Sequence, residues 1–157
     1  MNEIFQDLTS DQVDPAKHNH SRTDTQPILE AWHEAFHAQM ALHRGDVADA
    51  EKRTQAAIQL AQRRGDLFGE GVALRIQALA LAERNAQPSE VDELMRRSRA
   101  VLSDGGSVLE EARTQAAWGE LQLKRGDPDG KDRLRDALRT FEAAGLSWET
   151  DRIRPLI

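Results

Sequence analysis

The apolar residues from position 27 onward recur at steps of three and four, which is the spacing of one face of an α-helix. In the stretch ADAEKRTQAAIQLAQR, Ala50, Ala57 and either Leu60 or Ala61 follow this spacing among charged side chains. The stretch VALRIQALALAER carries alanine over so wide an arc that we expect contacts on two sides. No segment shows the valine- and isoleucine-rich alternation of a strand, so the pattern predicts an all-α protein.

Turn residues interrupt this pattern at a constant interval. RRGD ends one helical segment at Gly65, LSDGG ends the next at Gly105 and EAAGL ends a third at Gly145, an interval of 40 residues. A second set of breaks falls between them, at Gly45, near Asn85 and at Gly126. Glycine accepts the left-handed conformation that ends many helices, so each interval divides into two helices joined by a tight turn. The sequence therefore predicts three antiparallel helical hairpins.

The first 25 residues are polar and contain few large apolar side chains. We expect a flexible polar arm over residues 1–25, followed by one repeat domain over residues 26–157. Ile4, Phe5 and Leu8 would share a face if the arm became helical on contact with a surface. Two uses of that face stay open: the arm plugs a groove of its own domain, or it reaches a second subunit and helps to form a homodimer.

The other end of the chain is expected to cap the stack. An open array of hairpins exposes an apolar face at its last hairpin, and that face generally needs a cover. In the segment SWETDRIRPLI, we expect Trp148, Ile153 and Leu156 to lie against the last hairpin. Pro155 prevents a long regular continuation.

Composition narrows the class of protein. The chain has 157 residues, about one domain, and a formal net charge of −6. This acidic balance argues against a duplex nucleic-acid surface and against a polybasic membrane patch. The chain contains no cysteine, which excludes disulfides and thiolate metal sites, and no apolar run of membrane-spanning length. We therefore expect a soluble, cytoplasmic protein that binds neither nucleic acid nor membrane.

The segment HEAFH matches the His-Glu-x-x-His pattern, in which one helix of a zinc peptidase holds two metal ligands and a general base. His33 and His37 lie one helical turn apart and can share a metal. His43 falls where a longer signature has its third ligand, but that signature needs a helix-breaking glycine where this chain has Met40. In a continuous helix, His43 lies about 15 Å beyond His33 and about 80° around the axis, too far for a shared zinc ion.

A zinc peptidase also needs a cleft, usually with a strand edge that aligns the substrate, and the sequence predicts no strand. We therefore interpret HEAFH as part of an ordinary helix and expect no catalytic residue, no metal and no cofactor. A zinc-dependent peptidase remains the alternative from a different functional class.

Small residues lie at corresponding positions of the three predicted hairpins, which we treat as three repeat units. In the first unit Ala38 lies in the first helix, Gly45 and Asp46 form the turn, and Ala50 and Ala57 lie in the second helix. Small residues at these positions let neighbouring helices approach closely. The pattern resembles the tetratricopeptide repeat, especially the variety of about 40 residues found in bacterial signalling and transcription-regulator proteins.

The other two units follow the same pattern with departures. The third unit has Gly119 at the small position of its first helix and the turn KRGD, while Ala137 comes one position early. The middle unit keeps Ala78, but it has a longer, proline-containing turn and carries Glu90 and Arg97 where small residues are expected.

The resemblance, which covers residues 27–145, implies a right-handed α–α superhelix of about three stacked antiparallel hairpins with a short C-terminal capping helix. In such proteins the first helices of successive hairpins line a concave groove that accepts an extended peptide or a partner's helix. Carried over to this chain, the resemblance gives eight candidate partner-binding residues: Trp32, Gln39, His43, Arg75, Glu83, Arg113, Glu120 and Lys124. Arg75, Arg113 and Lys124 are the best candidates, because charged groups in a concavity can pair with a carboxylate.

The function that we expect is therefore that of a protein–protein interaction adaptor or scaffold, in signalling or regulation, with a protein or peptide as partner. A peptide-sensing regulatory domain is a second alternative, in which ligand binding changes the superhelix and the behaviour of an effector.

Overall fold

The computed structural model describes residues 27–157, and the arm expected over residues 1–25 lies outside the described residues. The helices of the described part are α1 (Pro27–His43), α2 (Val47–Arg64), α3 (Leu67–Glu83), α4 (Pro88–Asp104), α5 (Val108–Lys124), α6 (Asp129–Ala143) and α7 (Ser147–Ile153), followed by the 3-10 turn η2 (Arg154–Leu156). Residues 27–157 contain no strand. None of their helices combines the length and the apolar character that crossing a membrane requires.

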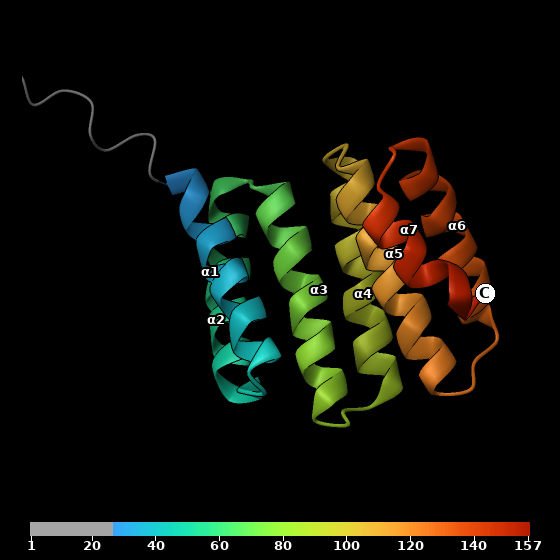
Figure 1. Cartoon of the computed structure of the whole chain (residues 1–157). Helices are drawn as coiled ribbons and strands as arrows, with labels where there is room; N and C mark the ends of the chain where they lie inside the picture. The colour runs from blue at the N-terminus through green and yellow to red at the C-terminus, as the bar shows by residue number, and fades with distance from the viewer. Residues whose placement is uncertain (1–26) are drawn as a thin grey trace, which may run out of the picture.

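The helices form a stack of antiparallel hairpins in chain order. Helices α1 and α2, α3 and α4, and α5 and α6 pair with each other, and α7 packs on α6. Figure 1 shows these hairpins side by side, from α1 and α2 at one end of the molecule to α6 and α7 at the other. The expected all-α superhelix of stacked hairpins with a short C-terminal helix is confirmed.

The turns follow the expected interval, with one correction. The residues with left-handed backbone are Gly45, Gly65, Asn85, Gly106, Gly126 and Gly145. The fourth helical segment was expected to end at Gly105, but Gly105 has φ of −80° and the left-handed residue is Gly106. Aspartates that follow two of the turn glycines cap the next helices: Asp46 accepts from the Asp49 amide at 3.1 Å and Asp66 accepts from the Gly69 amide at 2.9 Å.

The same one-residue shift corrects the register of the middle unit. Its buried positions in α4 are Val91 and Ser98, whereas Glu90 and Arg97 are exposed. The turn before α4, residues 84–87, is one residue longer than its counterpart in the first hairpin, and α4 begins at Pro88 with its inward face one residue later than expected.

The third hairpin is shifted in the opposite direction. Gly130 and Ala137 are buried against α5, four and eleven residues after the left-handed Gly126, whereas Ala50 and Ala57 follow Gly45 by five and twelve residues. A Cβ atom on Gly119 would lie 2.7 Å from the carbonyl oxygen of Gly130, so glycine is required where α5 and α6 cross. Each unit therefore keeps two buried residues, seven positions apart, where its helices cross, at positions that shift by one residue from unit to unit.

Small side chains dominate the core of the first junction. Ala35 and Ala38 of α1, Ala57 of α2, and Val72 and Ile76 of α3 belong to one buried cluster. Alanine at these contacts allows close approach of the helices. Helix α3 is central: all residues from 71 to 76 are buried.

The C-terminal segment caps the stack through fewer residues than expected. Ile153 is fully buried beside Phe141 of α6, as predicted. Trp148 and Leu156, which were expected to lie against the last hairpin, are 71% and 41% exposed. Trp148 and Ile153 are five residues apart, about 140° around the axis of α7, so one faces outward when the other faces the core.

Candidate functional site

A cavity of about 390 Å³ lies on the face formed by alternate helices. It is lined by Gln39, His43, Arg75, Leu79, Arg113, Ala117, Glu120, Leu121, Lys124, Trp148, Glu149 and Arg152. These residues come from α1, α3, α5 and α7. In Figure 1, α1 lies in front of α2 and α7 lies in front of α5. We refer to this cavity as the groove.

The structure brings together six of the eight residues proposed from the sequence: Gln39, His43, Arg75, Arg113, Glu120 and Lys124. The other two do not line the groove. Trp32 lies nearer the start of α1, where its ring stacks on Phe36 at a centroid distance of 5.9 Å. Glu83 is exposed at the last residue of α3.

Arg75 forms the floor of the groove and is held inside the protein. Its Nη2 donates to Glu110 Oε2 at 2.7 Å, and its Nη1 donates to the Glu110 carbonyl at 3.1 Å and to Thr114 Oγ1 at 3.3 Å. Beside it, the Ser98 hydroxyl donates to the Gly71 carbonyl at 2.7 Å and lies 3.1 Å from Thr114 Oγ1. We call these groups the polar layer. They join α3 and α4 to α5.

Arg113 extends this network along the wall of the groove. Its Nη1 donates to Glu110 Oε1 at 2.5 Å and its Nη2 donates to Glu149 Oε1 at 2.8 Å, which ties α5 to α7. Burial raises the pKa of Glu110, but Arg75 and Arg113 outweigh burial and hold that pKa below its usual value. The hydrogen bond from Arg113 likewise lowers the pKa of Glu149. Both carboxylates are therefore charged at neutral pH.

Three groups of the groove keep binding capacity. Lys124 is exposed and has no hydrogen bond or ion pair within residues 27–157. The His43 Nδ1–H donates to the Gln39 carbonyl at 2.9 Å, which leaves Nε2 as an acceptor. Trp148 offers an indole that is 71% exposed, with the Arg152 guanidinium 5.7 Å from its ring. An ammonium group, an imidazole and an indole together can bind a carboxylate, a backbone amide and an apolar side chain.

Helix α7 contributes to the groove, which was not expected from the sequence. Trp148, Glu149 and Arg152 line the groove, and Arg152 forms an ion pair with Glu120. The alternation of helices was a usable signal, since α7 follows α6 as α5 follows α4 and so returns to the same face. We had expected this segment only as a cap.

The HEAFH segment forms a local pair. His33 Nε2 and His37 Nε2 lie 3.1 Å apart, and Glu34 is bound by Arg53 at 3.2 Å. His43 bonds to the backbone of its own helix and lies in the groove instead. Across residues 27–157, no three histidine, aspartate or glutamate side chains are placed to hold one metal ion.

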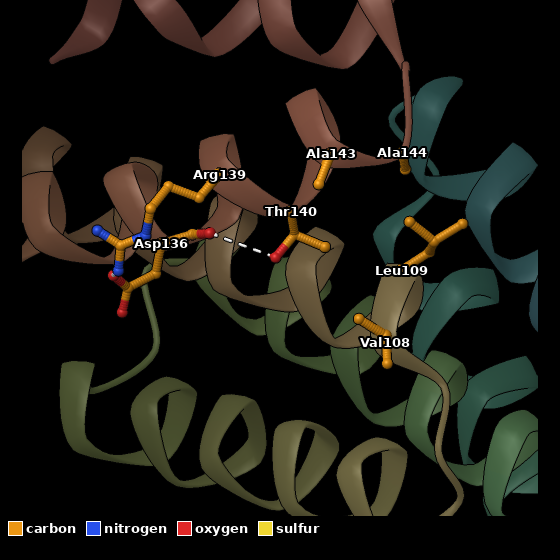
Figure 2. A pocket seen from close by; sticks show the side chains of 7 residues that line it. All are labelled: Val108, Leu109, Asp136, Arg139, Thr140, Ala143 and Ala144. Carbon is orange, nitrogen blue, oxygen red and sulfur yellow. Dashed lines mark hydrogen bonds and ion pairs between the residues drawn. The ribbon is translucent and has the colours of Figure 1, made fainter.

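A second hollow, of about 690 Å³, lies between the start of α5 and the end of α6. Figure 2 shows Val108 and Leu109 on one side, and Asp136, Arg139 and Thr140 on the other. Arg139 donates to Asp136 at 2.5 Å, and Thr140 donates to the Asp136 carbonyl at 3.4 Å. These polar groups are therefore satisfied by one another. The groove offers a richer set of unpaired groups.

No protein-family model, no curated protein and no solved structure matches the chain.

Proposed function

We propose that this protein is an interaction module, an adaptor or scaffold, that binds an extended peptide segment of a partner protein in the groove. One observation carries the proposal: alternate helices from all three hairpins and α7 line a single cavity that contains an unpaired Lys124 and an exposed Trp148. The resemblance to the tetratricopeptide repeat, whose first helices line a peptide-binding groove, supports the same proposal.

The groove suits a peptide with one carboxylate and one large apolar side chain. Lys124 would bind the carboxylate, because the other cations of the wall already have partners: Arg113 contacts Glu149, and Arg152 contacts Glu120. Trp148 would cover the apolar side chain. The paired arginines would act mainly as rigid walls that fix the width of the groove.

The test is selection of a random peptide library, displayed on phage, against the full chain. Selected peptides are then synthesised and titrated against the full chain and two variants by fluorescence anisotropy. Lys124→Glu should weaken binding at least about tenfold, because it replaces an attraction by a repulsion in the groove. Lys52→Glu is the matched control, because Lys52 is also an exposed lysine without a partner in residues 27–157 but lies on α2. Equal loss in both variants, or in neither, would contradict the proposal.

A further inference from the structure

Helix α1 carries an exposed apolar stripe on its outer side. Trp32, Phe36 and Met40 follow one another at four-residue steps and are 45%, 49% and 40% exposed. Side chains four residues apart on a helix are neighbours, and the stacked rings of Trp32 and Phe36 show that two members touch. Arg44, one turn beyond Met40, continues the stripe. Within residues 27–157, the three apolar side chains of the stripe are among the exposed large hydrophobic residues.

The position of the stripe in the stack explains why it is bare. Helices α3 and α5 each have a preceding hairpin packed beside them, but α1 belongs to the first hairpin. At the other end of the stack, α7 and its buried Ile153 provide the cover. A repeat array that is capped at one end still exposes apolar surface at the other.

We propose that residues 3–14 of this chain cover the stripe, with Ile4, Phe5 and Leu8 against Trp32, Phe36 and Met40. The chain enters α1 directly from the arm, at Pro27. The residues between Leu8 and Pro27 span up to about 60 Å when extended, whereas Met40 lies about 20 Å along α1. Such a tether holds the segment at an effective concentration on the order of millimolar, so it outcompetes a second copy at micromolar protein.

Charge supports the same occupant. Residues 3–14 contain Glu3, Asp7, Asp11 and Asp14 and no lysine or arginine. The carboxylates of the first hairpin that form ion pairs are Glu30 with Arg64, Glu34 and Asp49 with Arg53, and Glu51 with Arg84. In contrast, Arg44, which follows Met40 by four residues, has no ion pair in the described part of the chain. An acidic segment along the stripe therefore meets an unpaired cation at its end.

The groove is expected to bind the arm more weakly than the stripe does. Its arginines are paired with Glu110, Glu120 and Glu149, which an acidic segment would have to displace or approach. The proposed arm contact therefore leaves the groove free and does not depend on the function proposed for it.

The experiment uses the full chain, whose lack of cysteine makes a single introduced thiol a specific label. A nitroxide is attached through Gln6→Cys, and line broadening is measured in nuclear magnetic resonance spectra. We expect broadening of the Trp32 indole and of the amides of Phe36 and Met40, but none at Lys124. Mixing spin-labelled chain with isotope-labelled, label-free chain should give no broadening, because the contact is within one molecule.

Two sets of variants complete the test, with circular dichroism as the check that each remains helical. Ile4→Ser combined with Leu8→Ser should abolish the broadening, and so should Phe36→Ser. Leu109→Ser is the matched control, since Leu109 is exposed to 38% but lies at the start of α5, and it should leave the broadening unchanged. Broadening centred on the groove, broadening only in the mixed sample, or none at all would overturn the proposal.

Discussion

Arg75 is 9% exposed, and its guanidinium donates to groups on another hairpin. A buried ion pair is weak evidence for stability, because desolvation offsets much of the attraction. Removing one partner is different, because it leaves the other charge buried and uncompensated. At this site the carboxylate of Glu110 is the group that compensates the arginine.

Glu110→Gln should therefore lower the free energy of unfolding by about 3 kcal/mol. The neighbouring change Glu111→Gln is the matched control, since it removes an ion pair with Arg99 whose arginine side chain is 48% exposed. That pair is screened by water, and its loss should cost less than about 1 kcal/mol. Urea titrations of both variants give the comparison. Similar losses in the two would show that Arg75 is not dependent on Glu110.

At the scale of a single element, α7 has two functions. It covers the last hairpin through Ile153 and presents Trp148 to the groove. A helix of 7 residues has little stability of its own, so its position depends on these tertiary contacts.

Ile153→Ala should destabilise the protein by about 2–4 kcal/mol, because it opens a cavity beneath α7. Leu156→Ala, in a side chain that is 41% exposed, should cost less than half as much. Thermal unfolding followed by circular dichroism measures both. Equal changes in melting temperature would mean that α7 does not depend on the buried isoleucine.

At the scale of the whole molecule, the two junctions between hairpins differ in chemistry. The first is packed by alanine, valine and isoleucine. The second contains Trp118, whose Nε1 donates to Asp92 at 2.7 Å, and the polar layer around Arg75. Ion pairs cross both junctions, but the arginine of the pair at the first junction, Arg84 with Glu51, is largely exposed, whereas the pair of Arg75 with Glu110 at the second junction is nearly buried.

This difference predicts a dependence on acid. The pKa values of Glu110 and Glu149 lie below the usual value of 4.5, so their ion pairs contribute fully above that pH. The contribution is lost as pH falls through the lower pKa of the folded state. The melting temperature should drop as pH falls below about 4.5, and the drop should be smaller in Glu149→Gln. Glu83→Gln, at an exposed residue, should keep the full drop; an unchanged drop in Glu149→Gln would contradict this account.

The sequence predicts the helices and the turns because their signals are local. The apolar spacing and the turn glycines act within a few residues of where they stand. The predicted register of α4 was wrong by one residue, because the register depends on the conformation of the longer turn before Pro88. The ion pair of Arg75 could not be predicted, because its partner lies 35 residues away on another hairpin. The exposure of the Trp148 side chain could not be predicted either, because it depends on how α7 packs on α6.

The polar layer also bears on how the stack assembles. Hairpins of similar length that are rich in alanine can dock in the wrong order, or on a neighbouring chain during folding, which is a known failure of repeat proteins. An alanine surface discriminates poorly between such partners. Arg75 discriminates strongly, because docking on any surface that lacks a carboxylate at the right place would bury a bare guanidinium. Docking of the third hairpin beside the second is the arrangement that gives this guanidinium its partners, Glu110 and Thr114.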